Sequence, residues 1–132
     1  MNLELLSLGW AAVLGLVHII VASHVRTKEL GVTWNMSPRD NKLPQLSVLA
    51  GRLARAQANF FETFPLFAAA ILMVVIIQAY SLYSYWGALI YLFARIIYLP
   101  LYAFGIPKIR TLVWLISIIG LLMVLLPLLI LH

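Results

Sequence analysis

Four long apolar stretches, separated by short polar connections, decide what this chain can fold into. They run over residues 3–25, 46–78, 85–103 and 109–131. A helix needs roughly 20 mainly apolar residues to cross the ~30 Å hydrocarbon core of a bilayer, and each stretch has about that length or more. Hydrophobic residues make up 64% of the 132-residue chain and charged residues only 10%, which excludes an ordinary soluble domain. The sequence therefore predicts an all-α integral membrane four-helix bundle, forming one domain over residues 1–132.

The basic residues indicate how this bundle is oriented. Eight of the nine Lys and Arg residues fall in or beside the first and third connections, and Arg95 lies inside the third stretch on the side of the third connection, while the two termini and the second connection carry none. Basic residues favour the cytoplasmic side of a membrane, so we expect both termini on the non-cytoplasmic side, in a bacterial inner membrane. The net charge is +5, but the basic residues flank apolar spans and do not form a solvated basic face, so we predict no nucleic-acid partner.

The second stretch carries more polar groups than a membrane helix needs. Arg52, Arg55, Asn59 and Glu62 fall within an arc of roughly 80° on a helix, along about three turns. Ionisable groups at membrane depth are costly and persist where they line a cavity or pair with each other. Two interpretations follow, a structural polar seam between helices or a pocket for an anionic ligand.

The third stretch carries a second polar face. Tyr91, Arg95, Tyr98 and Tyr102 lie within an arc of roughly 60°. If the second and third stretches fold back on each other about residues 79–84, Tyr102 comes near the level of Glu62, and Arg95 comes within its reach. A buried Arg95–Glu62 ion pair that only compensates itself is the alternative to a binding role.

The balance of charge favours a ligand. One carboxylate, Glu62, faces four converging arginines: Arg52, Arg55, Arg95 and Arg110. The surplus indicates an absent anion, and planar guanidinium groups suit carboxylates well. With Glu62 and Asn59 as acceptors for an ammonium or amide group, the sequence predicts a site for a small zwitterion with excess negative charge.

Two segments, RAQANFFETFPLF and YLFARIIYLPLY, resemble motifs of the MAPEG family, the membrane-associated proteins in eicosanoid and glutathione metabolism. The motifs are similar to those of its leukotriene C4 synthase and microsomal glutathione transferase members, and the four-span layout covers nearly the whole chain. The resemblance implies a homotrimer with glutathione bound between neighbouring subunits. By motif position it implies glutathione-binding roles for Arg55, Gln57, Asn59, Glu62, Arg95, Tyr98 and Tyr102. Gln57 points away from the face of Arg52 and Glu62, which suits contact with a second subunit's ligand.

The chain departs from the family pattern at two places. In the family motif a tyrosine follows the glutamate, and in this chain that position is Thr63. The spacing between Tyr102 and Arg110 also differs slightly from the family pattern. We nevertheless predict Arg110 as the catalytic residue, because a guanidinium and a helix N-terminus both favour a thiolate beside them. Arg26 either matches a first-helix arginine of the family or is a charge at the membrane boundary.

The resulting hypothesis is a membrane glutathione transferase that takes a lipophilic electrophile from the membrane lipid, or that acts as a glutathione peroxidase on a lipid hydroperoxide. The alternative is a non-catalytic lipid-binding helper protein of the same fold. The chain has no cysteine, so any thiol must come from a ligand, and we predict no metal site. We expect His18 to have a packing role. The connection over residues 26–45 either covers the site or is an ordinary loop.

Overall fold

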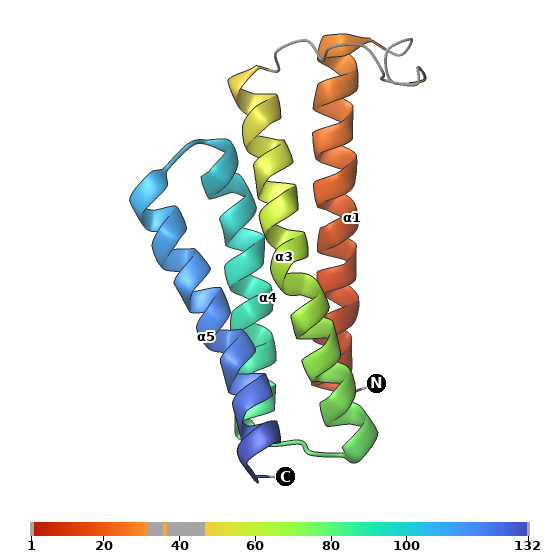
Figure 1. The fold of residues 1–132 in the computed structure, drawn as a ribbon, viewed down its shortest axis with the longest axis vertical. Coiled ribbons are helices and arrows are strands. Elements are labelled where there is room, and N and C mark those ends of the chain that lie inside the picture. The colour runs from red at the N-terminus through yellow and green to blue at the C-terminus, as the bar shows by residue number, and fades with distance from the viewer. Residues whose placement is uncertain (1, 32–35, 37–46, 132) are drawn as a thin grey trace.

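In the part of the chain that the structure describes, four long helices run side by side (Figure 1). A computed structural model describes residues 2–31, 36 and 47–131 of the chain. The helices are α1 (Leu3–Leu30), α3 (Val48–Ile77), α4 (Leu82–Ala103) and α5 (Pro107–Leu131). All four are long and apolar enough to cross a membrane. The predicted four-helix membrane bundle is therefore confirmed.

Successive helices run in opposite directions, which gives the bundle one basic end (Figure 1). The end of α1, the start of α3 and the α4–α5 turn lie at this end, while the chain termini lie at the opposite end. We use the name basic end because the described residues there include Arg26, Lys28, Arg52, Arg55, Lys108 and Arg110. Residues 32–35 and 37–46 lie outside the described residues, so a covering role for that connection stays a prediction.

Capping side chains move the helix boundaries away from the predicted spans. The hydroxyl of Ser47 accepts a hydrogen bond from the backbone N–H of Ala50 at 3.1 Å and starts α3. Ser81 and Ser84 form a reciprocal capping box, so α4 begins at Leu82 and not at residue 85. α1 continues to Leu30, so residues 26–30 are helical and not part of a loop.

Polar contacts join the helix ends on both sides of the bundle. At the basic end, Glu29 of α1 accepts hydrogen bonds from the backbone N–H of Ser47 at 2.9 Å and from its hydroxyl at 2.5 Å. At the opposite end, the buried carboxylate of Glu4 accepts one from the hydroxyl of Ser84 at 2.9 Å. Because these bonds join α1 to α3 and to α4, they hold the helices in register.

α4 and α5 approach each other most closely at two glycines. A Cβ atom added to Gly87 would lie 2.7 Å from the carbonyl oxygen of Gly120. One added to Gly120 would lie 2.6 Å from the backbone nitrogen of Tyr91. Such backbone contact is how helices pack in a bilayer, where small residues permit close approach and no hydrophobic effect drives association. This contact fixes how closely α4 and α5 pack below the basic end.

Candidate functional site

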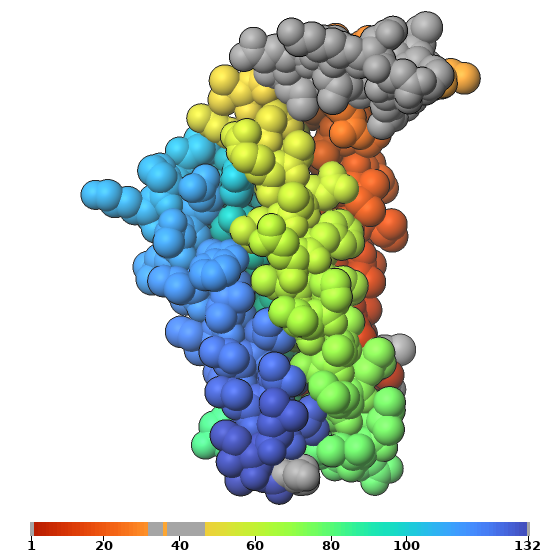
Figure 2. Space-filling model, in the orientation of Figure 1, coloured from red at the N-terminus to blue at the C-terminus, as the bar shows by residue number. Residues whose placement is uncertain are grey.

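A groove of about 290 Å³ opens between α3, α4 and α5 in the half of the bundle nearer the basic end. We call it the polar groove. Its lining residues are Asn59, Tyr98, Tyr102, Arg110, Thr111 and Trp114. In Figure 2 the upper parts of α3 and α5 stand apart on this face, and α4 is visible between them. Four of the nine predicted site residues thus meet in one cavity: Asn59, Tyr98, Tyr102 and Arg110.

Arg95 lies directly behind this groove and is fully buried. Its Nη1 donates a hydrogen bond to Oδ1 of Asn59 at 2.9 Å, and its Cζ lies 4.3 Å from the ring centroid of Tyr98. Asn59, and not Glu62, is therefore its hydrogen-bond partner, and the expected pairing with Glu62 is not formed. Its Nε and Nη2 atoms are buried and have no hydrogen-bond partner among the described residues. Buried donors without partners are costly, so Arg95 retains unused capacity to bind an acceptor.

Arg110 lies in the first turn of α5, which begins at Pro107. Its Cζ lies 4.4 Å from the ring centroid of Tyr102, close enough for a cation–π contact. This contact is with the face of the Tyr102 ring, so it leaves the N–H groups of Arg110 able to donate hydrogen bonds. The N-terminal end of a helix also carries a partial positive charge. Arg110 and the start of α5 therefore present positive potential to the polar groove.

The structure places four other predicted residues outside the polar groove. Arg52 packs on the α4–α5 turn: a Cβ atom added to Gly105 would lie 2.5 Å from the Cζ of Arg52. Arg55 and Glu62 are exposed on the outer face of α3, and Gln57 is half-buried. Within one chain, the charged residues predicted to share a face of the second helix therefore separate. Arg52 packs on the turn, while Arg55 and Glu62 lie on the exposed surface.

Tyr91 belongs to the core and not to the groove. It is fully buried, its ring stacks on Phe67 at 4.1 Å between centroids, and its hydroxyl hydrogen-bonds to that of Thr63 at 2.8 Å. Thr63 stands where the resemblance places a tyrosine, so here the position serves packing between α3 and α4. His18 is buried and stacks on Phe60 at 4.9 Å, which agrees with the packing role predicted for it.

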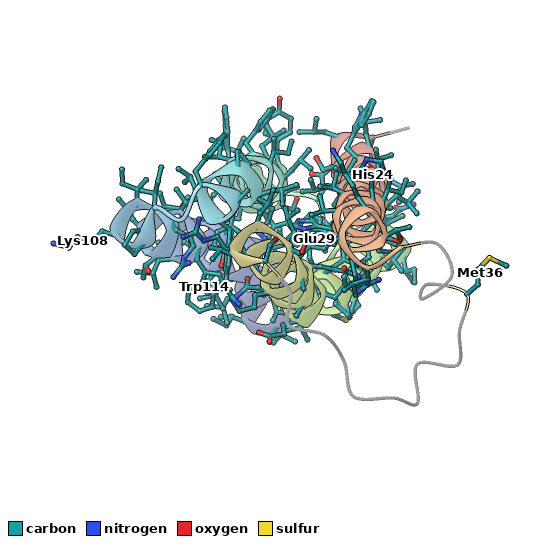
Figure 3. The ribbon with its side chains drawn as sticks, turned by 90° about the horizontal axis from the view of Figure 1, so that it is seen from above. His24, Glu29, Met36, Lys108 and Trp114 are labelled. Atoms are coloured by element: carbon teal, nitrogen blue, oxygen red, sulfur yellow. The ribbon has the colours of Figure 1, made fainter. Side chains whose placement is uncertain are left out.

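Trp114 is one of the two groove residues, with Thr111, that are not among the predicted site residues. It follows Arg110 by four residues on α5, so the two side chains share one helix face. In Figure 3, which looks along the bundle from the basic end, Trp114 lies near α3, while Lys108 points away from the bundle. The signal that could have identified Trp114 is this spacing from Arg110.

Comparison with known proteins identifies the family. The model of the MAPEG family matches residues 7–130, which is nearly the whole chain. No curated protein and no solved structure matches the chain. The match includes most of each of the four helices and all six residues that line the polar groove. The chain belongs to the MAPEG family.

Proposed function

We propose that the protein is a membrane glutathione transferase that binds glutathione in the polar groove. Its second substrate is a lipophilic electrophile, or a lipid hydroperoxide that it reduces. The observation that supports this most directly is the meeting of Asn59, Tyr98, Tyr102 and Arg110 in one groove, backed by Arg95. Membership of the MAPEG family, which includes glutathione transferases, supports it independently.

The chemistry of the groove fits glutathione, which has two carboxylates and one ammonium group. Arg95 has two buried nitrogen atoms that find no hydrogen-bond partner in the described part of the chain, and Arg110 adds a second guanidinium at the groove wall. Guanidinium groups bind carboxylates with two parallel hydrogen bonds. The volume of about 290 Å³ is at the lower limit of the roughly 300–1,000 Å³ typical of small-molecule sites. The groove of one chain would therefore enclose glutathione only in part.

Glutathione supplies the nucleophilic thiol that this cysteine-free chain lacks. A thiol has an ordinary pKa of about 8.5, so only a small fraction is ionised at neutral pH. An adjacent positive charge favours the ionised form, which is the reactive one. In our proposal Arg110 and the N-terminal end of α5 provide that charge, Tyr98 and Tyr102 border the reacting group, and Arg95 and Asn59 hold the ligand's carboxylates.

We further propose a homotrimer, supported by the exposed charges on α3. Glu62 is followed by fifteen residues up to the helix end at Ile77, which span only about 22 Å. This is less than the ~30 Å hydrocarbon core, so Glu62 lies at hydrocarbon depth. A carboxylate facing lipid is costly, and a neighbouring subunit would cover it together with Arg55. Three subunits are what the family resemblance implies.

The test is glutathione-dependent turnover by the purified protein. We expect conjugation of a chromogenic electrophile, and reduction of a lipid hydroperoxide, at rates above those of glutathione alone. A non-catalytic helper protein would bind the lipophilic compound and leave both rates unchanged. That result would contradict the proposed enzyme activity.

A further inference from the structure

A second groove, of about 350 Å³, lies between α1 and α4 and is lined only by apolar side chains. Its floor is formed by the buried residues Leu14 and Leu92. Its walls include Trp10 and Phe93, which are 58% and 56% exposed, and it is completed by Val13, Val17 and Ile96. We call it the α1–α4 groove. None of its residues belongs to the polar groove or to the proposed glutathione site.

The α1–α4 groove opens on the face of the bundle that lies away from α3. Figure 3 shows α3 on one side of the pair formed by α1 and α4, and the groove residues belong to that pair alone. The exposed charge that we place at hydrocarbon depth, Glu62, is on α3. Among the residues that the structure describes, none that lines the α1–α4 groove is charged. An uncharged apolar surface of this kind is stable in contact with lipid.

The helical face of α1 that forms this groove continues into basic side chains. At 100° per residue, Trp10, Val17, His24 and Lys28 fall within an arc of roughly 40°. His24 and Lys28 are both exposed. They lie roughly 10 and 16 Å beyond Val17 along the helix, towards the basic end. Half of the ~30 Å hydrocarbon core is ~15 Å. If Val17 lies near the middle of the core, His24 and Lys28 therefore lie near the membrane surface.

From this arrangement we infer that the α1–α4 groove binds one acyl chain of an anionic phospholipid whose headgroup contacts Lys28 and His24. The lipid belongs to the leaflet at the basic end. The apolar groove accounts for the chain, since burying methylene groups in a shaped groove of apolar side chains replaces looser contacts with bulk lipid. Lys28 accounts for the headgroup preference, because a basic residue at the membrane surface attracts anionic lipid. This site does not depend on the proposed glutathione chemistry.

The first test measures lipid retention by native mass spectrometry of the full chain, purified in detergent and supplied with phosphatidylglycerol. We expect one retained lipid per chain in the wild type. Val17→Trp fills the groove from an exposed position and should abolish retention. Leu112→Trp is the matched control, because Leu112 is exposed on α5, outside both grooves. Equal retention in the two variants would overturn the proposal.

The second test measures headgroup preference by fluorescence quenching. In a Trp34→Phe, Trp86→Phe, Trp114→Phe background only Trp10 remains, and it lines the groove. Brominated phosphatidylglycerol should quench it at a lower mole fraction than brominated phosphatidylcholine. Lys28→Gln should reduce this preference about fivefold, the value for one basic residue at a membrane surface. Lys108→Gln, at the opposite edge of the bundle, should leave it unchanged (Figure 3).

Two results would overturn the inference. One is equal quenching by the two lipids in the background variant. The other is a change in oligomeric mass with Val17→Trp but not with Leu112→Trp, which would show that a second copy of the chain covers the groove.

Discussion

Arg95 on α4 donates a hydrogen bond to Asn59 on α3 at 2.9 Å, and this is the contact that links the buried charge of the bundle to the polar groove. Arg95 is fully buried, whereas Asn59 is half-buried and lines the groove. The amide therefore has two roles, since it satisfies one nitrogen of the guanidinium and forms part of the groove wall. Substitutions at position 59 can separate the two.

Asn59→Leu should destabilise the protein, because it leaves a third nitrogen of Arg95 without a partner. We expect a loss of about 1–3 kcal/mol, measured as a lower thermal unfolding midpoint in detergent. Asn59→Asp should restore stability by pairing with Arg95, yet weaken glutathione binding because it neutralises the charge that attracts carboxylates. Ile76→Ala is the control on the same helix, because Ile76 is 76% exposed and lies outside the groove, and it should change neither property. If Asn59→Asp bound glutathione as tightly as the wild type, the proposed role of Arg95 would be wrong.

Arg110→Ala should shift the pH dependence of turnover. If Arg110 stabilises the thiolate, its removal raises the thiol pKa towards about 8.5. The rate at neutral pH should fall about tenfold for each unit of that shift and recover as the pH is raised. The measurement is the pH profile of kcat/KM for conjugation, with Lys108→Ala as the control for loss of an exposed charge. An Arg110→Ala profile that overlays the wild type would remove Arg110 from the mechanism.

Gly105→Ala should be destabilising for two separable reasons. Gly105 has a φ of +72°, which costs a non-glycine residue about 1–2 kcal/mol, and an added Cβ atom would displace the flexible end of Arg52 from the turn, which is the smaller of the two costs. In an Arg52→Ala background only the backbone cost should remain. A double-mutant cycle on unfolding midpoints measures the difference. Gly9→Ala is the control, because a Cβ atom there meets nothing within 4 Å. Fully additive effects would show that Arg52 does not pack on the turn.

Gly87→Ala and Gly120→Ala should each force α4 and α5 apart, because an added Cβ atom would lie within 3 Å of backbone atoms of the facing helix. Overpacking of this kind costs about 1–3 kcal/mol. The double variant should cost less than the sum, since the first methyl group has already separated the helices. Unfolding in detergent checks the prediction, with Gly9→Ala again as the control. A double variant as stable as the wild type would contradict the close approach of the two helices.

Much of the fold could be predicted from the sequence because hydrophobic length is a strong signal in a membrane chain. The four helices and the gathering of basic residues at one end follow from this signal alone. The start of α4 could not be placed as well, because it depends on the local capping box of Ser81 and Ser84. The extension of α1 to Leu30 was missed because the prediction ended the helix where the apolar stretch ends. Polar residues such as Lys28 continue the helix beyond that point.

The candidate site was only partly predictable, for a geometric reason. Helical periodicity places Arg55, Asn59 and Glu62 on one face, but an arc of 80° is wide enough to divide between a groove and an open surface. Asn59 falls on the groove side, while Arg55 and Glu62 are exposed. The partner of Arg95 could not be chosen either, because Asn59 and Glu62 are less than one turn apart. That choice depends on how α3 and α4 are rotated against each other, which periodicity alone does not determine.

The central claim is that the buried guanidinium group of Arg95 binds carboxylate groups of glutathione, while the groove-lining Arg110 stabilises its thiolate. Isothermal titration calorimetry of glutathione into the correctly assembled, purified protein tests it most directly. We predict a saturable heat of binding that is strongly reduced when the glutathione dimethyl ester, which lacks free carboxylates, replaces glutathione. No saturable heat with glutathione, or equal binding of the ester, would contradict the account.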